Sequence, residues 1–404
     1  MKNHWFLPKK MKVCVVTHFY VLHGIPVELE CFFRNNFSTT ILIAHPFSYS
    51  PYRYSICRVS DRVNGYKEYR VPRVKLNSVF NFALDFLITC YFLIRSHQRV
   101  HLYLGLNWLN TFVGLMLRRF GFCRNVIFYS IDFVQRRFRS YLLNLLYHAF
   151  DIVVAAKSDL VWNLGAPIAK IRSQRWNFKK RLNQLVVPYG TFRIKMEQPP
   201  DECAFIHRWK SKRVCFLGHL RSGQGLELLP GVVRLLLPYF PDLKLIIIGD
   251  GELKDSLERR FEKLGVKNNV EFLGIVNGDR LNLELSRAVV GLAPYPPRSL
   301  ASYSDPAKVK TYLSYGIPVV ITSHTTISEK VKNASAGIVC KYEEEEIAAA
   351  IRDILTNYEF YMKLTRGALR LAESYFWDTL YEQALVKTLQ VMERNSKKRL
   401  PVSV

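Results

Sequence analysis

The 404-residue sequence lacks the cysteine and histidine patterns that mark disulfide-bonded or metal-bound proteins. Its 8 cysteines form no CxxC pair, and its 10 histidines include no HExxH motif. Cysteines scattered in or beside apolar runs are typical of small core residues in a reducing compartment. The sequence therefore predicts no disulfide framework and no metal site, and it predicts a cytoplasmic protein.

Long apolar runs are also missing. The longest, residues 80–94, is interrupted by Asn81 and Asp85, and residues 102–117 contain Asn107 and Asn110. Neither run is long and apolar enough to span a bilayer. No signal-peptide stretch precedes the first expected strand. We therefore expect no transmembrane segment, and the ordinary proportions of 49% hydrophobic and 23% charged residues predict two globular domains.

Acidic residues are scarce in the first half. Residues 1–200 contain 29 Lys and Arg against 9 Asp and Glu, whereas residues 201–404 contain 29 against 24. Such an imbalance predicts an anionic partner for the first half, such as phosphates, acidic lipid or nucleic acid. Because no RNP, zinc-finger or basic-helix signature is present, nucleic acid is not the expected partner.

The most basic segment, residues 170–181, combines six Lys and Arg with Trp176 and Phe178. That mixture suits an anionic bilayer surface, although a solvated loop has the same composition. The expectation is a peripheral position at the inner face of the membrane.

Short apolar strands alternate with helix-length segments along the whole chain. The expected strands are residues 12–17, 40–44, 101–104, 126–129, 152–155, 185–187, 214–217, 243–248, 270–273, 289–293, 319–322 and 337–339. Near-continuous apolar strands between helices predict parallel sheets covered on both faces. The fold class is therefore α/β, with two Rossmann-like domains (residues 1–198 and 199–375) whose parallel sheets face a central cleft. Residues 376–404 are expected to form a terminal helix and basic tail that crosses back to the first domain.

Residues 304–320 contain the sharpest local pattern. Asp305 suits a helix N-cap, Pro306 suits the first helical position, and Gly316 suits the stop before a buried strand. The N–H groups at such a helix start, together with Lys308, are suited to hold a diphosphate. An ordinary capped helix before a strand is the alternative.

Three glycine-containing turns precede this segment. They follow the strands that end near Gly218, Gly249 and Gly274, and the first continues to Gly225. Glycine lets a backbone approach a phosphate closely, although each turn taken alone is a common connection between a strand and a helix.

In their order and spacing, these segments resemble the C-terminal domain of GT-B glycosyltransferases of the retaining family 4 group, over about residues 212–375. The matching residues are Gly218, Gly225, Gly249, Gly251, Val270, Gly274, Pro306, Lys308, Tyr312, Leu313, Gly316, Pro318, Val319, Val320 and Glu329. The resemblance implies a transferase that moves a sugar from a nucleotide-diphosphate donor to a glycan or lipid-linked acceptor with retention. It implies no cofactor or metal, the nucleotide sugar being a substrate.

The sequence departs from this pattern at several catalytic positions. His219 and Gln224 stand where the family often has Arg and Lys, and Tyr303 and Thr311 stand at its paired glutamates. The family's N-domain histidine falls near Ile131. These departures leave open a non-catalytic partner or scaffold of another glycosyltransferase, and a GT-B epimerase is a further alternative.

The resemblance and the local chemistry together give the candidate site residues. The donor-binding set is Gly218, His219, Arg221, Gln224, Gly225, Gly249, Gly251, Gly274, Ser304, Asp305, Lys308 and Thr311. Asp132 and His18 are the catalytic candidates. Asp132 follows an apolar strand and is suited to deprotonate an acceptor hydroxyl, although a loop or helix-capping aspartate has the same pattern. Gly24 and Asn107 are expected on the acceptor side.

Overall fold

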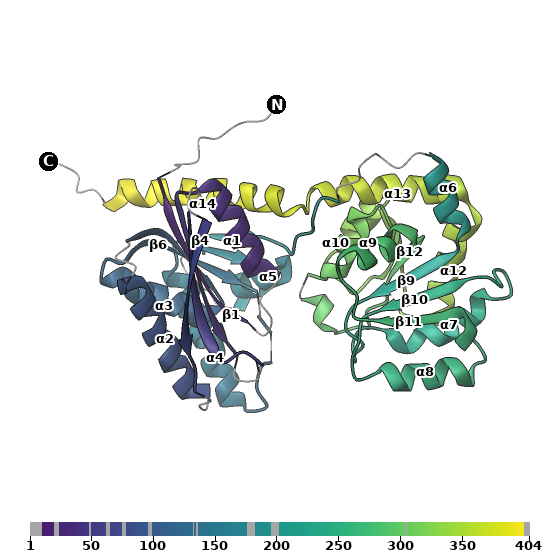
Figure 1. Ribbon diagram of the computed structural model, residues 1–404, viewed down its shortest axis with the longest axis horizontal. Helices are drawn as coiled ribbons and strands as arrows, with labels where there is room; N and C mark the ends of the chain where they lie inside the picture. Colours follow the sequence, from purple (N-terminus) through teal and green to yellow (C-terminus); the bar gives the residue numbers. More distant parts are fainter. Residues whose placement is uncertain are drawn as a thin grey trace. The chain divides into compact units, whose positions relative to one another are not determined.

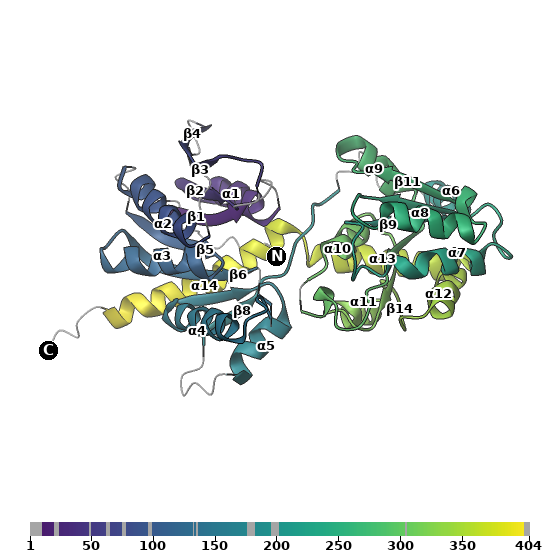
Figure 2. The same ribbon diagram turned by 90° about the horizontal axis from the view of Figure 1, so that it is seen from below.

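The computed structural model describes residues 10–19, 24–47, 50–61, 65–74, 78–95, 99–131, 133–134, 136–175, 182–194, 202–303 and 305–399. The chain forms two compact units (Figures 1 and 2). Unit 1 comprises Met1–Pro188 and Leu380–Val404, and unit 2 comprises Tyr189–Thr379. The divisions thus fall at 188/189 and 379/380, whereas the sequence placed them at 198/199 and 375/376.

Unit 1 contains an eight-stranded sheet in the order β4-β3-β2-β1-β5-β6-β7-β8. Its strands are β1 (Lys12–Phe19), β2 (Thr39–Pro46), β3 (Tyr54–Asp61), β4 (Gly65–Pro72), β5 (Val100–Leu106), β6 (Cys123–Ser130), β7 (Leu160–Asn163) and β8 (Gln184–Val186). The β2–β3 and β3–β4 pairs are antiparallel, and the others are parallel. Consecutive residues of β1 are fully buried, which explains its unbroken apolar sequence.

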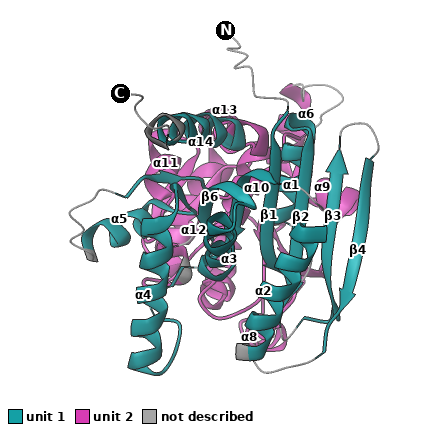
Figure 3. Cartoon of the chain, turned by 90° about the vertical axis from the view of Figure 1, so that its left-hand side faces the viewer, with its two compact units in different colours: residues 1–188, 380–404 teal, residues 189–379 magenta. Residues whose placement is uncertain are grey.

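Helices cover both faces of this sheet. They are α1 (Ile25–Asn36), α2 (Ser78–Arg95), α3 (Trp108–Arg119), α4 (Tyr141–Lys157), α5 (Ala166–Arg175) and α14 (Trp377–Arg399). Figure 3 shows α4, α3 and α2 side by side on one face, and Figure 1 shows α1 and α14 on the other. The terminal helix packs on unit 1 from Leu380 onward, as expected, and Trp162 donates its indole N–H to the Thr388 hydroxyl at 3.2 Å.

Two elements of unit 1 differ from the expectation. Residues 152–155 lie in α4, not in a strand, and the strand comes later as β7. An apolar run of this length does not distinguish a strand from a helix by periodicity. The hairpin of β3 and β4 was not predicted, because β4 is largely exposed and mixes charged with aromatic side chains instead of forming an apolar run.

Unit 2 contains a six-stranded sheet with the order β11-β10-β9-β12-β13-β14, in which every strand pair is parallel. Its strands are β9 (Arg213–Leu217), β10 (Lys244–Ile248), β11 (Val270–Gly274), β12 (Val290–Ala293), β13 (Val319–Thr322) and β14 (Gly337–Cys340). All six expected strands of the second half are therefore present. Because the strands are parallel, the turns that follow them meet at one edge of the sheet.

The helices of unit 2 form layers on both faces of its sheet. They are α6 (Glu202–Lys210), α7 (Leu229–Leu236), α8 (Lys254–Lys263), α9 (Gly278–Arg287), α10 (Ala307–Ser314), α11 (Ser328–Asn333), α12 (Glu344–Thr356) and α13 (Tyr358–Glu373), with short 3-10 turns at Leu226–Leu228, Lys267–Asn269 and Leu300–Ser302. A core that includes Phe216, Ile247, Val233 and Ile351 joins the sheet to α7 and α12. The α/β class with two Rossmann-like sheets is thus confirmed.

Within the described ranges, no helix is both long and apolar enough to cross a membrane.

Candidate functional site

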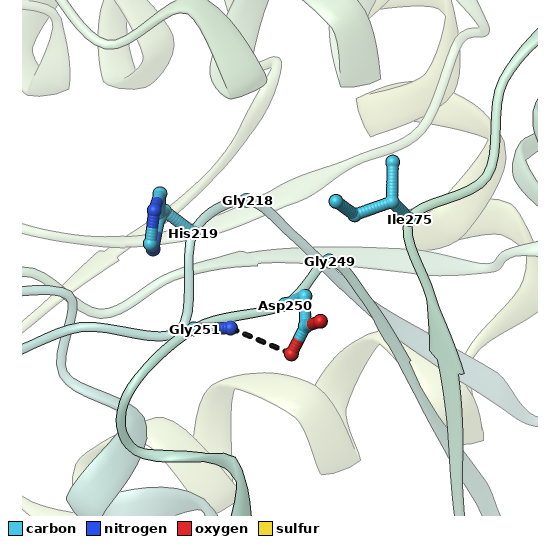
Figure 4. A pocket seen from close by; sticks show the side chains of 6 residues that line it. All are labelled: Gly218, His219, Gly249, Asp250, Gly251 and Ile275. Carbon is cyan, nitrogen blue, oxygen red and sulfur yellow. Dashed lines mark hydrogen bonds between the residues drawn. The ribbon is translucent and has the colours of Figure 1, made fainter. Parts of the chain in front are cut away.

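A pocket of about 540 Å³ lies in unit 2 where β9, β10 and β11 end (Figure 4). Its lining consists of Gly218, His219, Gly249, Asp250, Gly251 and Ile275. Four of these residues belong to the expected donor-binding set. Asp250 and Ile275 were not singled out, although both directly follow glycines of that set.

The glycines allow two turns to pack against each other at van der Waals contact. A Cβ atom on Gly249 would lie 1.9 Å from the Gly218 carbonyl oxygen, and one on Gly251 would lie 2.4 Å from that of Leu220. Gly225 has a φ of +76°, and its Cβ would lie 1.6 Å from the Pro294 oxygen. No side chain fits at these three positions without movement of the backbone.

The backbone donors of these turns are largely used within the turns themselves. The Gly218 N–H donates to the Ile248 oxygen at 2.9 Å, and the Gly249 N–H donates to the Gly274 oxygen at 2.8 Å. The Gly251 N–H donates to Oδ1 of Asp250 at 2.8 Å (Figure 4). These glycines therefore let the two turns and a ligand approach each other closely. Their own N–H groups are already bonded within the protein, so other groups must donate hydrogen bonds to a ligand.

Lys308 provides a buried amino group next to the first turn. It is 8% exposed, its Nζ lies 2.8 Å from Oε1 of Gln224, and it sits 3.7 Å from the centroid of the Phe216 ring. Burial lowers the pKa of Lys308 well below its ordinary value, and the charge of Arg221 acts in the same direction. An incoming anion would relieve both effects.

Arg221 and His219 are exposed on the loop after β9. Neither side chain makes an ion pair or hydrogen bond with any described residue. The loop after β9 therefore contributes an exposed guanidinium, and the start of α10 contributes the buried Lys308 amino group, while Asp250 is the one carboxylate among the residues that line the pocket. Cationic groups beside a glycine turn suit a phosphate.

Asp305 does not cap α10, contrary to the expectation. The helix starts one residue later than predicted, at Ala307, with Pro306 at the N-cap position. The Asp305 carboxylate instead accepts the backbone N–H of Tyr189 at 2.7 Å and pairs with Lys310, which is fully buried. Asp305 thus anchors the first residues of unit 2 to α10, and the first-turn N–H groups of α10 have no intrahelical carbonyl to bond.

Tyr312 fixes α10 against the central strand. Its hydroxyl accepts the Leu217 N–H at 2.6 Å, and its ring leaves no space for a Cβ on Gly291. The Thr311 hydroxyl bonds the Ala307 carbonyl of its own helix. Gly274 ends β11 with a φ of +67°, and Ser304 lies outside the described residues.

In unit 1, His18 lies in a buried polar cluster at the carboxyl end of β1. Its Nε2 lies 2.9 Å from Oδ2 of Asp85, and its side chain is 4% exposed. Asp85 also pairs with Arg73 at 2.6 Å and lies 3.5 Å from Nδ1 of His45. The sequence marked His18 but did not mark Asp85, Arg73 or His45 as site residues. Asp85 entered only as a polar interruption of an apolar run.

The amide groups around His18 define its tautomer. Oδ1 of Asn107 accepts the Asn110 N–H as the cap of α3, so Nδ2 of Asn107 faces Nδ1 of His18 at 3.3 Å. Nδ2 of Asn110 also lies 3.1 Å from that nitrogen. His18 therefore accepts at Nδ1 and donates from Nε2 to Asp85, which leaves neither nitrogen open to take a proton from an acceptor.

Burial sets the pKa of His45, whereas hydrogen bonding and nearby charges set that of Asp85. Burial lowers the pKa of His45 to about 3, so this imidazole is neutral between the Ser55 and Thr89 hydroxyls. Burial alone would raise the pKa of Asp85, but the hydrogen bond from His18 and the nearby positive charges lower it overall. The cluster thus holds the Asp85 carboxylate and the Arg73 guanidinium beside a neutral His45.

The remaining first-half candidates are only partly described. Gly24 precedes α1 with a φ of +72°, and its carbonyl accepts the N–H groups of Val27 and Glu28. Asp132 lies outside the described residues, as do residues 176–181 of the basic segment. Among the residues that the structure describes, no group of three His, Cys, Asp or Glu side chains is arranged to hold a metal ion.

The residues that line this pocket lie in a region of the chain that matches a known protein family. Residues 204–370 match the family described as Glycosyl transferases group 1. An uncharacterized glycosyltransferase of Methanocaldococcus jannaschii is 30% identical over 178 residues, which is 43% of this chain and 44% of that protein. The GDP-mannose-dependent alpha-(1-6)-phosphatidylinositol dimannoside mannosyltransferase of Mycobacterium tuberculosis is 28% identical over 203 residues, 48% of this chain and 49% of that protein.

The chain therefore spans about half the length of the curated relatives it matches. Among solved structures, HepE of Anabaena in complex with UDP has a TM-score of 0.68 at 15% identity, covering 94% of this chain and 100% of that chain. Unit 2 thus contains a glycosyl transferases group 1 domain, and the chain has the fold of the GT-B glycosyltransferases.

Proposed function

We propose that this protein transfers a sugar from a nucleotide-diphosphate donor to a hydroxyl of a glycan or lipid-linked acceptor. The observation that carries the proposal is the coincidence of the matched family region with the pocket at the ends of β9 and β10. The glycine turns that line this pocket, and the buried Lys308 next to Gly218, suit a diphosphate. HepE, which has the same fold, is in complex with UDP, and the mycobacterial relative is named as GDP-mannose-dependent.

In the proposed reaction, the bond between the sugar C1 and the phosphate oxygen breaks, and its electron pair leaves with the diphosphate. The acceptor hydroxyl oxygen forms the new bond to C1, and its proton passes to a base. Lys308, Arg221 and the first-turn N–H groups of α10 would stabilise the negative charge that develops on the diphosphate, which is the largest catalytic contribution in many enzymes.

The finer features of the proposal come from the family resemblance. The new bond forms on the same face of the sugar as the old one, and the diphosphate is stabilised by protein groups without a metal or cofactor. Asp132 is proposed as the acceptor-side base. Because both nitrogens of His18 are engaged, we assign His18 a positioning role beside Asn107.

The test is isothermal titration calorimetry of the purified protein with UDP-, GDP-, ADP- and CMP-linked sugars, followed by transfer and hydrolysis assays with the sugar that binds. Saturable binding of one nucleotide class and release of its nucleoside diphosphate are expected. If none of these donors or the free nucleoside diphosphates binds at millimolar concentration, the proposal is wrong.

The second candidate function is a non-catalytic partner of another glycosyltransferase. Tyr303 and Thr311 at the positions of the family's paired glutamates favour it, since neither side chain supplies a carboxylate. Donor binding without transfer or hydrolysis, across a panel of glycan and lipid-linked acceptors, would support this alternative.

A further inference from the structure

The outer helix layer of unit 1 exposes large apolar side chains. On α2 these are Phe80, Phe82, Leu87, Tyr91 and Ile94; on α3, Phe112; and on α4, Tyr141, Leu142, Leu143, Leu145, Leu146, Phe150 and Val153. Leu87 is 60% and Leu142 is 62% exposed. Figure 3 shows the three helices side by side, so these side chains belong to one layer. We call this set the α2–α4 apolar face.

The exposed positions follow the helical repeat. On α2, Phe80, Leu87, Tyr91 and Ile94 recur at the spacing of one helix face, while Ile88 and Phe92 on the opposite face are buried against the sheet. On α4, Leu142, Leu146, Phe150 and Val153 recur in the same way, and Val154 and Ala155 are buried. Both helices are therefore apolar on the inner and the outer face, which is the pattern of a helix that is covered on both sides.

Acidic side chains are missing from this outer surface. The acidic residues of α2, α3 and α4 are Asp85 and Asp151, and both are buried in ion pairs, with Arg73 and with Arg172. The layer contains no other Asp or Glu. Nothing on the α2–α4 apolar face would therefore repel an anionic surface.

Basic side chains lie at both ends of the helices. Arg136 and Arg139 precede α4, Arg119 ends α3, and Lys157 ends α4; all four are exposed, and none makes an ion pair with a described residue. In parallel βαβ units the helices run in the same direction, so Arg119 and Lys157 lie at one end of the layer and Arg136 and Arg139 at the other. The apolar face is thus bordered by unpaired cations.

We propose that the α2–α4 apolar face docks unit 1 on an anionic lipid bilayer. The apolar side chains would enter the boundary between headgroups and acyl chains, and the cations at the helix ends would contact the anionic headgroups. A second copy of the chain would fit this surface poorly, because a symmetric contact would bring the same unpaired cations together without an acidic partner. The proposal does not depend on the sugar transfer proposed above.

The test is flotation of the full-length protein with vesicles of phosphatidylcholine alone and of phosphatidylcholine mixed with phosphatidylglycerol. We expect binding to the mixed vesicles. The variant L87E/L146E places a carboxylate on each helix and should lower the partition coefficient at least tenfold. R136Q/R139Q should lower it only on mixed vesicles, by about fivefold for each arginine.

The matched control is L283E, which changes a similarly exposed leucine of α9 in unit 2. It should bind vesicles as the unchanged protein does. All variants should keep the circular dichroism spectrum and the nucleotide-sugar affinity of the unchanged protein, which separates docking from folding and from donor binding.

Three results would overturn the proposal. The first is failure of the unchanged protein to float with either vesicle, and the second is equal flotation of L87E/L146E. The third is a concentration-dependent dimer, seen by light scattering and lost in L87E/L146E, in a protein that does not bind vesicles; this would assign the α2–α4 apolar face to self-association.

Discussion

The Nζ of Lys308 lies 2.8 Å from Oε1 of Gln224, so a buried ammonium group is held by a neutral amide oxygen at the mouth of the first glycine turn. A neutral partner positions the cation but does not neutralise it. The Gly218 position is close enough that a Cβ there would lie 3.1 Å from the Lys308 Nζ. The absence of a side chain at residue 218 therefore leaves space next to the Lys308 Nζ.

Replacing Lys308 with Ala should weaken nucleotide-sugar binding by about tenfold to a hundredfold, the usual contribution of a hydrogen bond to a charged group. Calorimetry measures the change. Lys267→Ala is the matched control, because Lys267 pairs with Glu262 on the exposed surface of the same unit. Equal affinities of the two variants would remove Lys308 from the donor site.

Donor binding should also be coupled to proton uptake. Burial holds the pKa of Lys308 low in the free protein, and a bound diphosphate would raise it. Because the diphosphate of a nucleotide sugar has no group that titrates near pH 7, titrations in buffers of different ionisation heat report uptake by the protein. We expect uptake that persists in His219→Gln and disappears in Lys308→Ala.

The glycine turns give a prediction with a control in the same unit. Gly249→Ala places a Cβ 1.9 Å from a backbone oxygen at a φ of +138°, and should lower the free energy of unfolding by about 3 kcal/mol or more. At Gly223 a Cβ would meet open space, but φ is +81°. Gly223→Ala should therefore lower the free energy of unfolding only by the backbone strain, about 1–2 kcal/mol. Chemical denaturation would compare them, and equal losses would contradict the close contact of the two turns.

Asp305→Ala should destabilise unit 2 by about 3–5 kcal/mol, because it leaves Lys310 buried without its carboxylate. The double variant D305A/K310M removes both charges and should recover most of that loss. Denaturation midpoints measure the effect. If the double variant is as unstable as Asp305→Ala, the hydrogen bond that the Tyr189 N–H donates to Asp305, not the ion pair, is the important contact.

The buried His45 predicts an acid-dependent loss of stability. Its pKa is about 3 in the folded protein and about 6.5 in an unfolded chain, so between these values only the unfolded state binds the proton. The free energy of unfolding should therefore fall as the pH decreases from 6.5, by up to about 1.4 kcal/mol per pH unit. Asp85, with a pKa already below its ordinary value, adds a similar loss only at lower pH.

His45→Gln should flatten this slope between pH 4 and 6.5, since a glutamine can still bond a neighbouring hydroxyl but does not titrate. His207→Gln changes an exposed histidine of α6 and should leave the slope unchanged. A slope that is the same in all three proteins would show that other groups control the acid dependence.

The second half was more predictable from sequence than the first. Strands such as β10 are buried on both faces between well-marked helices, and Gly218, Gly249 and Gly251 of the expected turns line the pocket. The prediction of a strand at residues 152–155 was wrong, because an apolar segment fits either a buried strand or a helix that exposes apolar side chains. Its helical form depends on the packing of α4 beside α3, which no local pattern contains.

The partners of the site residues were the hardest to predict. Asp305 fits the sequence rule for a helix cap, but its carboxylate accepts a hydrogen bond from the backbone N–H of Tyr189, which is far away in the sequence. Likewise, His18 was marked by its position after a strand, whereas Asp85 and Arg73 become its neighbours only when the sheet has formed. Such contacts arise from tertiary structure, and neither propensity nor spacing encodes them.

The placement of α14 has a consequence for the order of events on the ribosome. Tyr381 of this helix packs 5.5 Å from the ring of Phe32 in α1, and Thr388 bonds Trp162 of β7. The strands of unit 1 are synthesised first, but their covering helix is synthesised after all of unit 2. During translation, unit 2 can therefore close its core before unit 1 does, and a nascent chain that stops at Thr379 would leave the amino-terminal sheet with an uncovered apolar surface.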